Sequence, residues 1–136
     1  MKDFVTFEIA KKLKEKGFKE QCLAYYTQDA EFYYNTSYGS DVESAFRSFN
    51  SQPNSICGKR IDAPIISQAL NWLRKEKKIH IMIDIWKVDV NDTNYKWGYD
   101  IINLTTTKVI GSDTQCAYTY EQAALAGIEY TSNNLI

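Results

Sequence analysis

Residues 79–86 read IHIMIDIW, in which isoleucine occupies every second position. Successive side chains of a β-strand point to opposite faces, so this spacing predicts a strand with one fully apolar face. The other face carries His80, Met82, Asp84 and Trp86. We expect the apolar face to pack in the core, and the mixed face to meet either solvent or a partner.

The segments around this strand predict an antiparallel sheet. Residues 89–94 are polar and typical of a turn, and residues 95–102 alternate again, so the two strands form a hairpin. A further strand is expected at residues 113–118, after a turn at Gly111. The prediction is an α+β fold in the order α-β-(long loop)-α-β-β-β-α. Its antiparallel sheet of about three to four strands carries about three helices on one face.

The N-terminal region predicts a helix followed by a short strand. Residues 4–16 repeat apolar side chains at helical spacing on one face and place lysines on the other. Gly17 suits the position just after the helix, and Phe18 is expected to fold back onto its last turn. Residues 22–26 read CLAYY, a short apolar run that predicts a strand.

Two further helices have start signals in the sequence. Asp62 suits the N-cap of a helix that ends in the basic residues 74–78. Thr119 and Gln122 match a capping box, in which two side chains satisfy the first backbone N–H groups of a helix. Small residues at 123–127 would let this last helix lie close against the sheet.

Length and composition predict a single domain over residues 1–136. Apolar residues make up 44% of the chain and charged residues 24%, near the average of globular domains. A chain of this length buries about two-thirds of its unfolded surface, so its core needs no disulfide or metal. Residues 27–60 are the exception: Ser, Asn, Gly and Pro there predict an irregular loop or insertion, interrupted by a short helix at residues 42–49.

Charge and hydropathy argue against some classes of protein. The formal net charge is −1, whereas proteins that bind nucleic acids usually carry a basic excess. No run approaches the roughly 18 apolar residues of a membrane span, and the first residues lack the apolar centre of a signal peptide. We therefore expect a cytoplasmic protein without membrane contacts, in which the cysteines stay reduced.

Three segments resemble a group of small uncharacterised proteins of gut bacteria and their prophages, phages and mobile elements. They are FEIAKKLKEKGF at residues 7–18, IDAPIISQALNWLRKEKKIHIMIDIW at 61–86, and TYEQAALAGIEYTSNNLI at 119–136. The resemblance covers most of the chain except residues 27–60 and the second hairpin strand. The segment at residues 27–60 is longer here than in other members of the group. The group has no assigned activity or catalytic motif. The resemblance therefore implies a setting, that of a phage or mobile-element accessory protein, and no site residues.

Candidate catalytic and metal-ligating residues form no recognisable motif. Cys22, Cys57, Cys116 and His80 would make a zinc set, but every gap exceeds twenty residues, whereas structural zinc sites use close pairs. A nucleophilic pair of Cys57 and His80 lacks any family signature, and no glycine-rich phosphate loop is present. We expect no metal, cofactor or catalytic residue. The alternative is a small hydrolase that uses the cysteine or carboxylates of residues 27–60.

Aromatic residues are the stronger functional signal, at 14% of the chain with ten tyrosines and three tryptophans. Exposed Tyr and Trp are enriched at protein interfaces, although the long loop packing on the sheet would also explain them. We predict a non-enzymatic protein-binding module with a partner of unknown identity. A homodimer formed by strand pairing at the hairpin edge stays open. The predicted partner-binding residues are Tyr33, Tyr34, Tyr38, His80, Met82, Asp84 and Trp86.

The alternative is a nucleic-acid-binding accessory protein, in which basic residues contact phosphate and aromatic side chains stack on bases. Basic residues near helix ends also suit the negative end of the helix dipole, which explains them without a ligand. The residues of this alternative are Lys11, Lys12, Lys14, Arg74, Lys75, Lys77 and Lys78.

Overall fold

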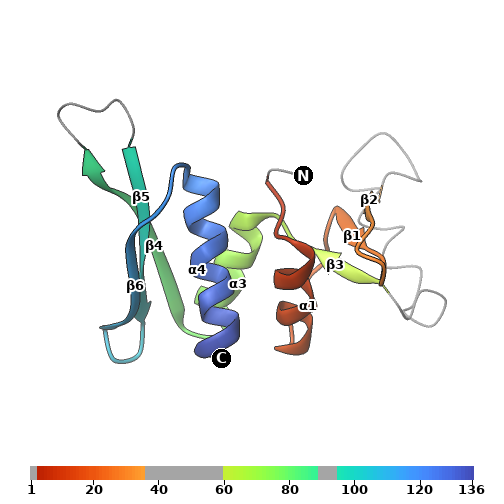
Figure 1. Cartoon of the computed structure of the whole chain (residues 1–136). Coiled ribbons are helices and arrows are strands. Elements are labelled where there is room, and N and C mark those ends of the chain that lie inside the picture. Colours follow the sequence, from red (N-terminus) through yellow and green to blue (C-terminus); the bar gives the residue numbers. More distant parts are fainter. Residues whose placement is uncertain (1–2, 36–59, 89–94) are drawn as a thin grey trace. The chain divides into compact units, whose positions relative to one another are not determined.

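The computed structural model describes residues 3–35, 60–88 and 95–136, in which the chain forms two compact units (Figure 1). The first unit comprises residues 3–65 and the second comprises residues 66–136. Each contains a three-stranded antiparallel sheet, so the α+β class is confirmed and the element order broadly matches. The predicted single sheet is wrong, because the first strand of the chain pairs with two short neighbours instead of the hairpin. One domain over the whole chain stays a prediction.

Helix α1 (Phe7–Glu15) begins later than the sequence pattern predicts. Its N-cap is Thr6, whose hydroxyl accepts a hydrogen bond from the backbone N–H of Ile9 at 3.4 Å. Phe4, where the helix was expected to begin, instead forms an antiparallel bridge with Ile65. Phe4 is therefore paired with another segment rather than helical.

The end of α1 confirms the prediction for Gly17 and Phe18. The N–H of Phe18 donates to the carbonyl of Leu13 at 2.9 Å, and the N–H of Gly17 donates to the carbonyl of Lys14 at 3.1 Å. These two bonds form a Schellman motif. Gly17 has a φ of 100°, which glycine adopts without steric cost, and Phe18 is buried.

Strand β1 (Ala24–Tyr26) is the middle strand of the first sheet, whose order is β2-β1-β3. Its antiparallel neighbours are β2 (Phe32–Tyr34) and β3 (Ile61–Ala63). The strand predicted at residues 22–26 is confirmed over its last three residues. Strand β2 lies inside the segment predicted to be irregular, which corrects that prediction for its first part.

Asp62 does not cap a helix, contrary to the prediction. It lies in β3 opposite Tyr25 of β1, and the neighbouring Ala63 is fully buried opposite Ala24. This pairing holds the segment in an extended conformation. Helix α3 (Ile66–Glu76) begins only after it.

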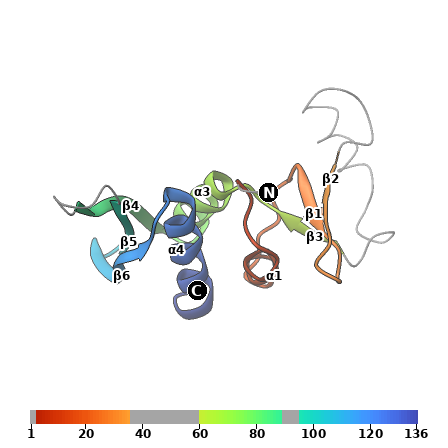
Figure 2. The same cartoon turned by 45° about the horizontal axis from the view of Figure 1, so that its top comes forward.

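The second sheet contains the predicted hairpin and one further strand. Strand β4 (Ile79–Val88) pairs with β5 (Tyr95–Asn103), and β5 pairs with β6 (Lys108–Ala117), all antiparallel. Helix α3 packs on β4, while α4 (Tyr120–Asn134) contacts all three strands. Figure 2 shows both helices on the same face of this sheet.

The turn before β6 lies at residues 104–107, so the predicted turn at Gly111 is wrong. Asn103 sets this turn, since its side-chain oxygen accepts a hydrogen bond from the N–H of Thr105 at 2.9 Å. Gly111 lies within β6, where an added Cβ would be 2.9 Å from the ring of Tyr130. The glycine is therefore explained by close packing of α4 rather than by a turn.

The start of α4 confirms the predicted capping residues, with one difference. The Thr119 hydroxyl accepts a hydrogen bond from the N–H of Gln122 at 3.1 Å. The side-chain oxygen of Gln122 accepts from the N–H of Tyr118 at 3.2 Å, one residue before the N–H used in a standard capping box.

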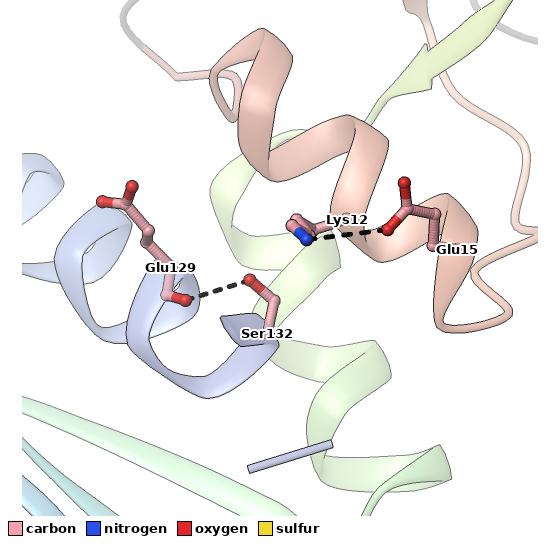
Figure 3. Close-up of polar contacts among 4 residues, drawn as sticks. All are labelled: Lys12, Glu15, Glu129 and Ser132. Atoms are coloured by element: carbon pink, nitrogen blue, oxygen red, sulfur yellow. Dashed lines mark hydrogen bonds and ion pairs between the residues drawn. The ribbon is translucent and has the colours of Figure 1, made fainter. Parts of the chain in front are cut away.

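Small and polar residues let α4 lie close against its sheet. An added Cβ at Gly127 would be 2.8 Å from Cγ2 of Ile81. Thr131 and Ser132 are buried, and both donate to carbonyls of their own helix. Figure 3 shows the bond from Ser132 Oγ to the carbonyl of Glu129, at 3.1 Å. The O–H donors of both buried side chains are thus paired within the helix.

Some predictions concern positions outside the described residues, namely the helix at 42–49, the turn at 89–94, Tyr38 and Cys57. Among the helices in the described ranges, none has the length and apolar character that crossing a bilayer requires.

Candidate functional site

The mixed face predicted for residues 79–86 lies on the side of the second sheet that points away from α3 and α4 (Figure 1). Ile79 and Ile81 on the helix side are buried, and Ile81 lies against Gly127 of α4. Alternation therefore turns the residues between the isoleucines to the opposite face. We call this the outer face; by strand register it consists of His80, Met82, Asp84, Asp100, Ile102, Val109 and Ser112.

Three apolar side chains cross the outer face. Ile102 pairs with His80 on β4 and with Val109 on β6, while Met82 pairs with Asp100. Met82 is 36% exposed and Val109 58% exposed, and Ile102 is half-buried. Apolar side chains grouped among polar ones in this way are typical of interaction surfaces.

Two carboxylates of the outer face are held by local hydrogen bonds. Asp100 accepts from the Ser112 hydroxyl at 2.5 Å, and Asp84 accepts from the backbone N–H of Ile85 at 2.7 Å. Each carboxylate thus has its own hydrogen-bond donor. The face combines an apolar row with fixed polar groups.

Trp86 departs from the row predicted for β4. The register with β5 shifts between Ile85 and Lys87, so Trp86 is the extra residue of a β-bulge. Simple alternation therefore no longer assigns its side chain to the outer face. Trp86 and Ile85 are both exposed, which leaves apolar surface near the end of β4.

The two described tyrosines of the predicted surface lie on opposite faces of β2. The Tyr33 ring stacks on Tyr25 at 5.7 Å, and its hydroxyl donates to Glu31 at 2.9 Å, which raises the pKa of Tyr33. Tyr34 instead packs edge-on against Phe4 at 5.8 Å. Both belong to the first unit and the outer face to the second, so a joint surface stays a prediction.

The first unit contains a cross-strand row that sequence reasoning missed. Tyr25 pairs with Tyr33 on one side and with Asp62 on the other, and the Arg60 guanidinium lies 3.6 Å from the centre of the Tyr25 ring. Burial raises the pKa of the Asp62 carboxyl, while the charges of Arg60 and Lys14 oppose that shift. The sequence predicted the strand that contains Tyr25, but nothing local predicted β3 as its neighbour.

The described cysteines are poor nucleophiles. Burial raises the pKa of the Cys22 thiol strongly, and the nearby Asp62 and Glu20 carboxylates raise it further. Burial also raises the pKa of Cys116. Both thiols therefore stay protonated near neutral pH, and the thiolate is the reactive form. In the part of the chain that the structure describes, no three or more His, Cys, Asp or Glu gather as a metal site.

The basic residues of α1 make contacts within the first unit. Lys12 Nζ lies 3.8 Å from the Glu15 carboxylate (Figure 3). Lys14 Nζ donates to the carbonyl of Arg60 at 2.8 Å. Two of the three lysines named for phosphate contact are thus engaged by protein groups.

The second basic tract, residues 74–78, belongs to the second unit. Arg74 donates to the side chain of Asn71 at 3.2 Å, and Lys77 lies 5.4 Å from the centre of the Trp72 ring. Lys78 has a φ of 56° at the turn from α3 into β4. A phosphate-binding surface that joins both tracts stays a prediction.

No family model, curated protein or solved structure matches this chain. The outer face is therefore interpreted from its own residues and their geometry.

Proposed function

We propose that the protein is a non-enzymatic module that binds another protein through the outer face. The supporting observation is the placement of Met82, Ile102 and Val109 on the sheet face opposite α3 and α4. Interfaces commonly surround an apolar centre with a polar rim, and here His80 and Asp100 pair with members of the apolar row. Removing such side chains from water contributes about 25 cal/mol per Å² of apolar area, and the entropy and desolvation costs of association oppose this gain.

The chemistry of the described residues favours binding over catalysis. Both described cysteines have a raised thiol pKa, and the carboxylates of the outer face are fixed by their own hydrogen-bond donors. The proposal includes a setting as a phage or mobile-element accessory protein, which rests on the sequence resemblance alone.

The test is capture of partners from bacterial lysate by the tagged protein, with and without nuclease, read by mass spectrometry. We expect a stoichiometric protein partner that survives nuclease treatment. Met82→Ala should weaken its capture about fivefold or more, because truncating a central interface residue typically costs about 1 kcal/mol or more.

The control is Asn133→Ala, since Asn133 is exposed on α4, the helix that covers the opposite face of the sheet. This variant should capture the partner as the wild type does. Equal capture by Met82→Ala and wild type contradicts the outer face as the binding surface. Partners that disappear with nuclease would favour the basic-residue alternative, and recovery of the bait alone would contradict a binding module.

A further inference from the structure

Strand β4 forms an open edge of the second sheet. It is the first strand in the order β4-β5-β6, and no other strand in the described ranges pairs with it. The N–H of Leu104 donates to the carbonyl of Lys78 at 2.8 Å, which turns the peptide groups of even-numbered residues along β4 toward β5. The register is unbroken from Ile79 to Ile85, so the N–H and C=O groups of the isoleucines face the open edge.

The two edges of this sheet differ in how they are protected. Strand β6 begins with Lys108, and its pairing with β5 contains two register shifts. Charged residues and bulges are features that keep sheet edges from pairing with other chains. From Ile79 to Ile85, β4 has no bulge, Lys or Pro, and its one charged residue is Asp84. It is the edge suited to accept another strand.

We propose that a second copy of this chain pairs antiparallel with β4, about a two-fold axis at Met82. The sequence IHIMIDI is self-complementary in this register, because reversing it exchanges only the histidine and the aspartate. Each dimer then contains two pairs of an imidazole donor opposite a carboxylate acceptor. The cross-strand pairs are Met82 with Met82, Ile81 with Ile83, His80 with Asp84, and Ile79 with Ile85 of the second copy.

Neighbouring registers lose this match. A two-fold axis at Ile81 places His80 against Met82 and carries Asp84 past the start of the partner strand. An axis at Ile83 places Asp84 against Met82. Opposite charges or hydrogen-bonding groups directly across an antiparallel pair stabilise it, so the axis at Met82 is favoured.

The same register also matches the apolar ends of the strand. Ile85 is 39% exposed, whereas Ile79 is 4% exposed at the end covered by helices. Pairing places Ile85 of each copy beside Ile79 of the other. The N–H of Ile85 exchanges its bond to Asp84 for the carbonyl of Ile79, which frees Asp84 to reach His80.

Sedimentation equilibrium of the purified protein over a range of concentrations tests this dimer. We expect a reversible species of twice the chain mass of 15.7 kDa. His80→Asp and Asp84→His each place like groups opposite one another twice, and each should raise the dissociation constant about tenfold or more. The double variant His80→Asp/Asp84→His recreates both pairs and should restore dimerisation, with circular dichroism confirming that every variant folds.

A second variant tests the edge itself. The N–H of Ile83 faces away from β5, so Ile83→Pro removes an edge donor while keeping the bonds to β5, and should give a monomer. A wild type that stays monomeric, single variants that dimerise normally, or a double variant as weak as the single ones would each overturn the proposal. The assay contains no lysate, so its outcome is independent of partner capture by the outer face.

Discussion

Single residues set the distance between α4 and the second sheet. Gly127 leaves no room for a methyl group, since an added Cβ would be 2.8 Å from Ile81 and 3.3 Å from Tyr99. Gly111 is similarly confined by Tyr130 and Ile101. In the sequence a glycine of this kind resembles a turn residue, because the atoms that exclude its Cβ come from elsewhere in the chain. This is why the predicted turn at Gly111 was wrong.

Gly127→Ala should lower the free energy of unfolding. Overpacking typically costs about 1–3 kcal/mol, and the better helix propensity of alanine returns up to about 1 kcal/mol, so we expect a net loss of about 1 kcal/mol or more. Urea denaturation measures the change. Asn133→Ala on the exposed side of the same helix is the control and should be neutral or slightly stabilising. A Gly127→Ala protein as stable as the wild type would contradict the close packing.

Asp62 makes stability depend on pH. Burial raises the pKa of its carboxyl above the ordinary value of 3.8, despite the charges of Arg60 and Lys14. The folded protein therefore holds this proton more tightly than the unfolded chain does. The stabilising contribution of Asp62 is fully present below its unfolded pKa and is lost as the pH rises through its folded pKa.

Comparison with Asp62→Asn isolates this contribution. The wild type should lose stability relative to the variant as the pH rises from about 3 to 7, because only the wild type must bury an ionised carboxylate. Urea denaturation of both proteins across this range gives the difference in unfolding free energy. A difference that does not change with pH, or that changes in the opposite direction, contradicts the raised pKa.

At the scale of elements, what the sequence predicted depended on how local the signal was. The end of α1 at Gly17 and the start of α4 at Thr119 rest on residues within one helical turn, and both predictions are confirmed. Strands β2 and β3 are three residues long, too short to show a period, and their pairing with β1 is set by distant parts of the chain. Both were therefore missed.

The same difference between local signals and pairing of distant segments applies to the candidate site. The outer-face residues of β4 follow from alternation alone, which the sequence shows directly. Trp86 falls on a bulge defined by the register with β5, and Tyr25 gains Asp62 as a neighbour only through β3. Neither arrangement has a local sequence signal.

The Schellman motif gives a prediction for an element boundary. An added Cβ at Gly17 has nothing within 4 Å, so a substitution there is opposed only by the φ of +100°. Gly17→Ala should cost about 1–2 kcal/mol, and Gly17→Asn less, because asparagine tolerates left-handed conformations better. Amide hydrogen exchange in α1 measures the local loss. Equal exchange in both variants and the wild type would contradict the assigned helix end.

At the scale of the whole molecule, composition and pattern predicted the α+β class but not the number of sheets. Which strands share a sheet depends on pairing between distant segments, and the strands in the described part of the chain form two separate groups of three. The second unit combines an exposed apolar row on one face with a core under two helices on the other. This difference between the two faces is the basis of the proposed binding function.

The most direct measurement is hydroxyl-radical footprinting of the protein alone and in its captured complex, at equal protein concentration. The extent of side-chain modification, read by mass spectrometry, reports the exposure of individual residues. The expected result is strong protection of Met82 and Val109 in the complex, with Tyr130, which is 39% exposed on α4, modified equally in both samples. Unchanged modification of Met82 and Val109 in a stoichiometric complex would contradict binding through the outer face.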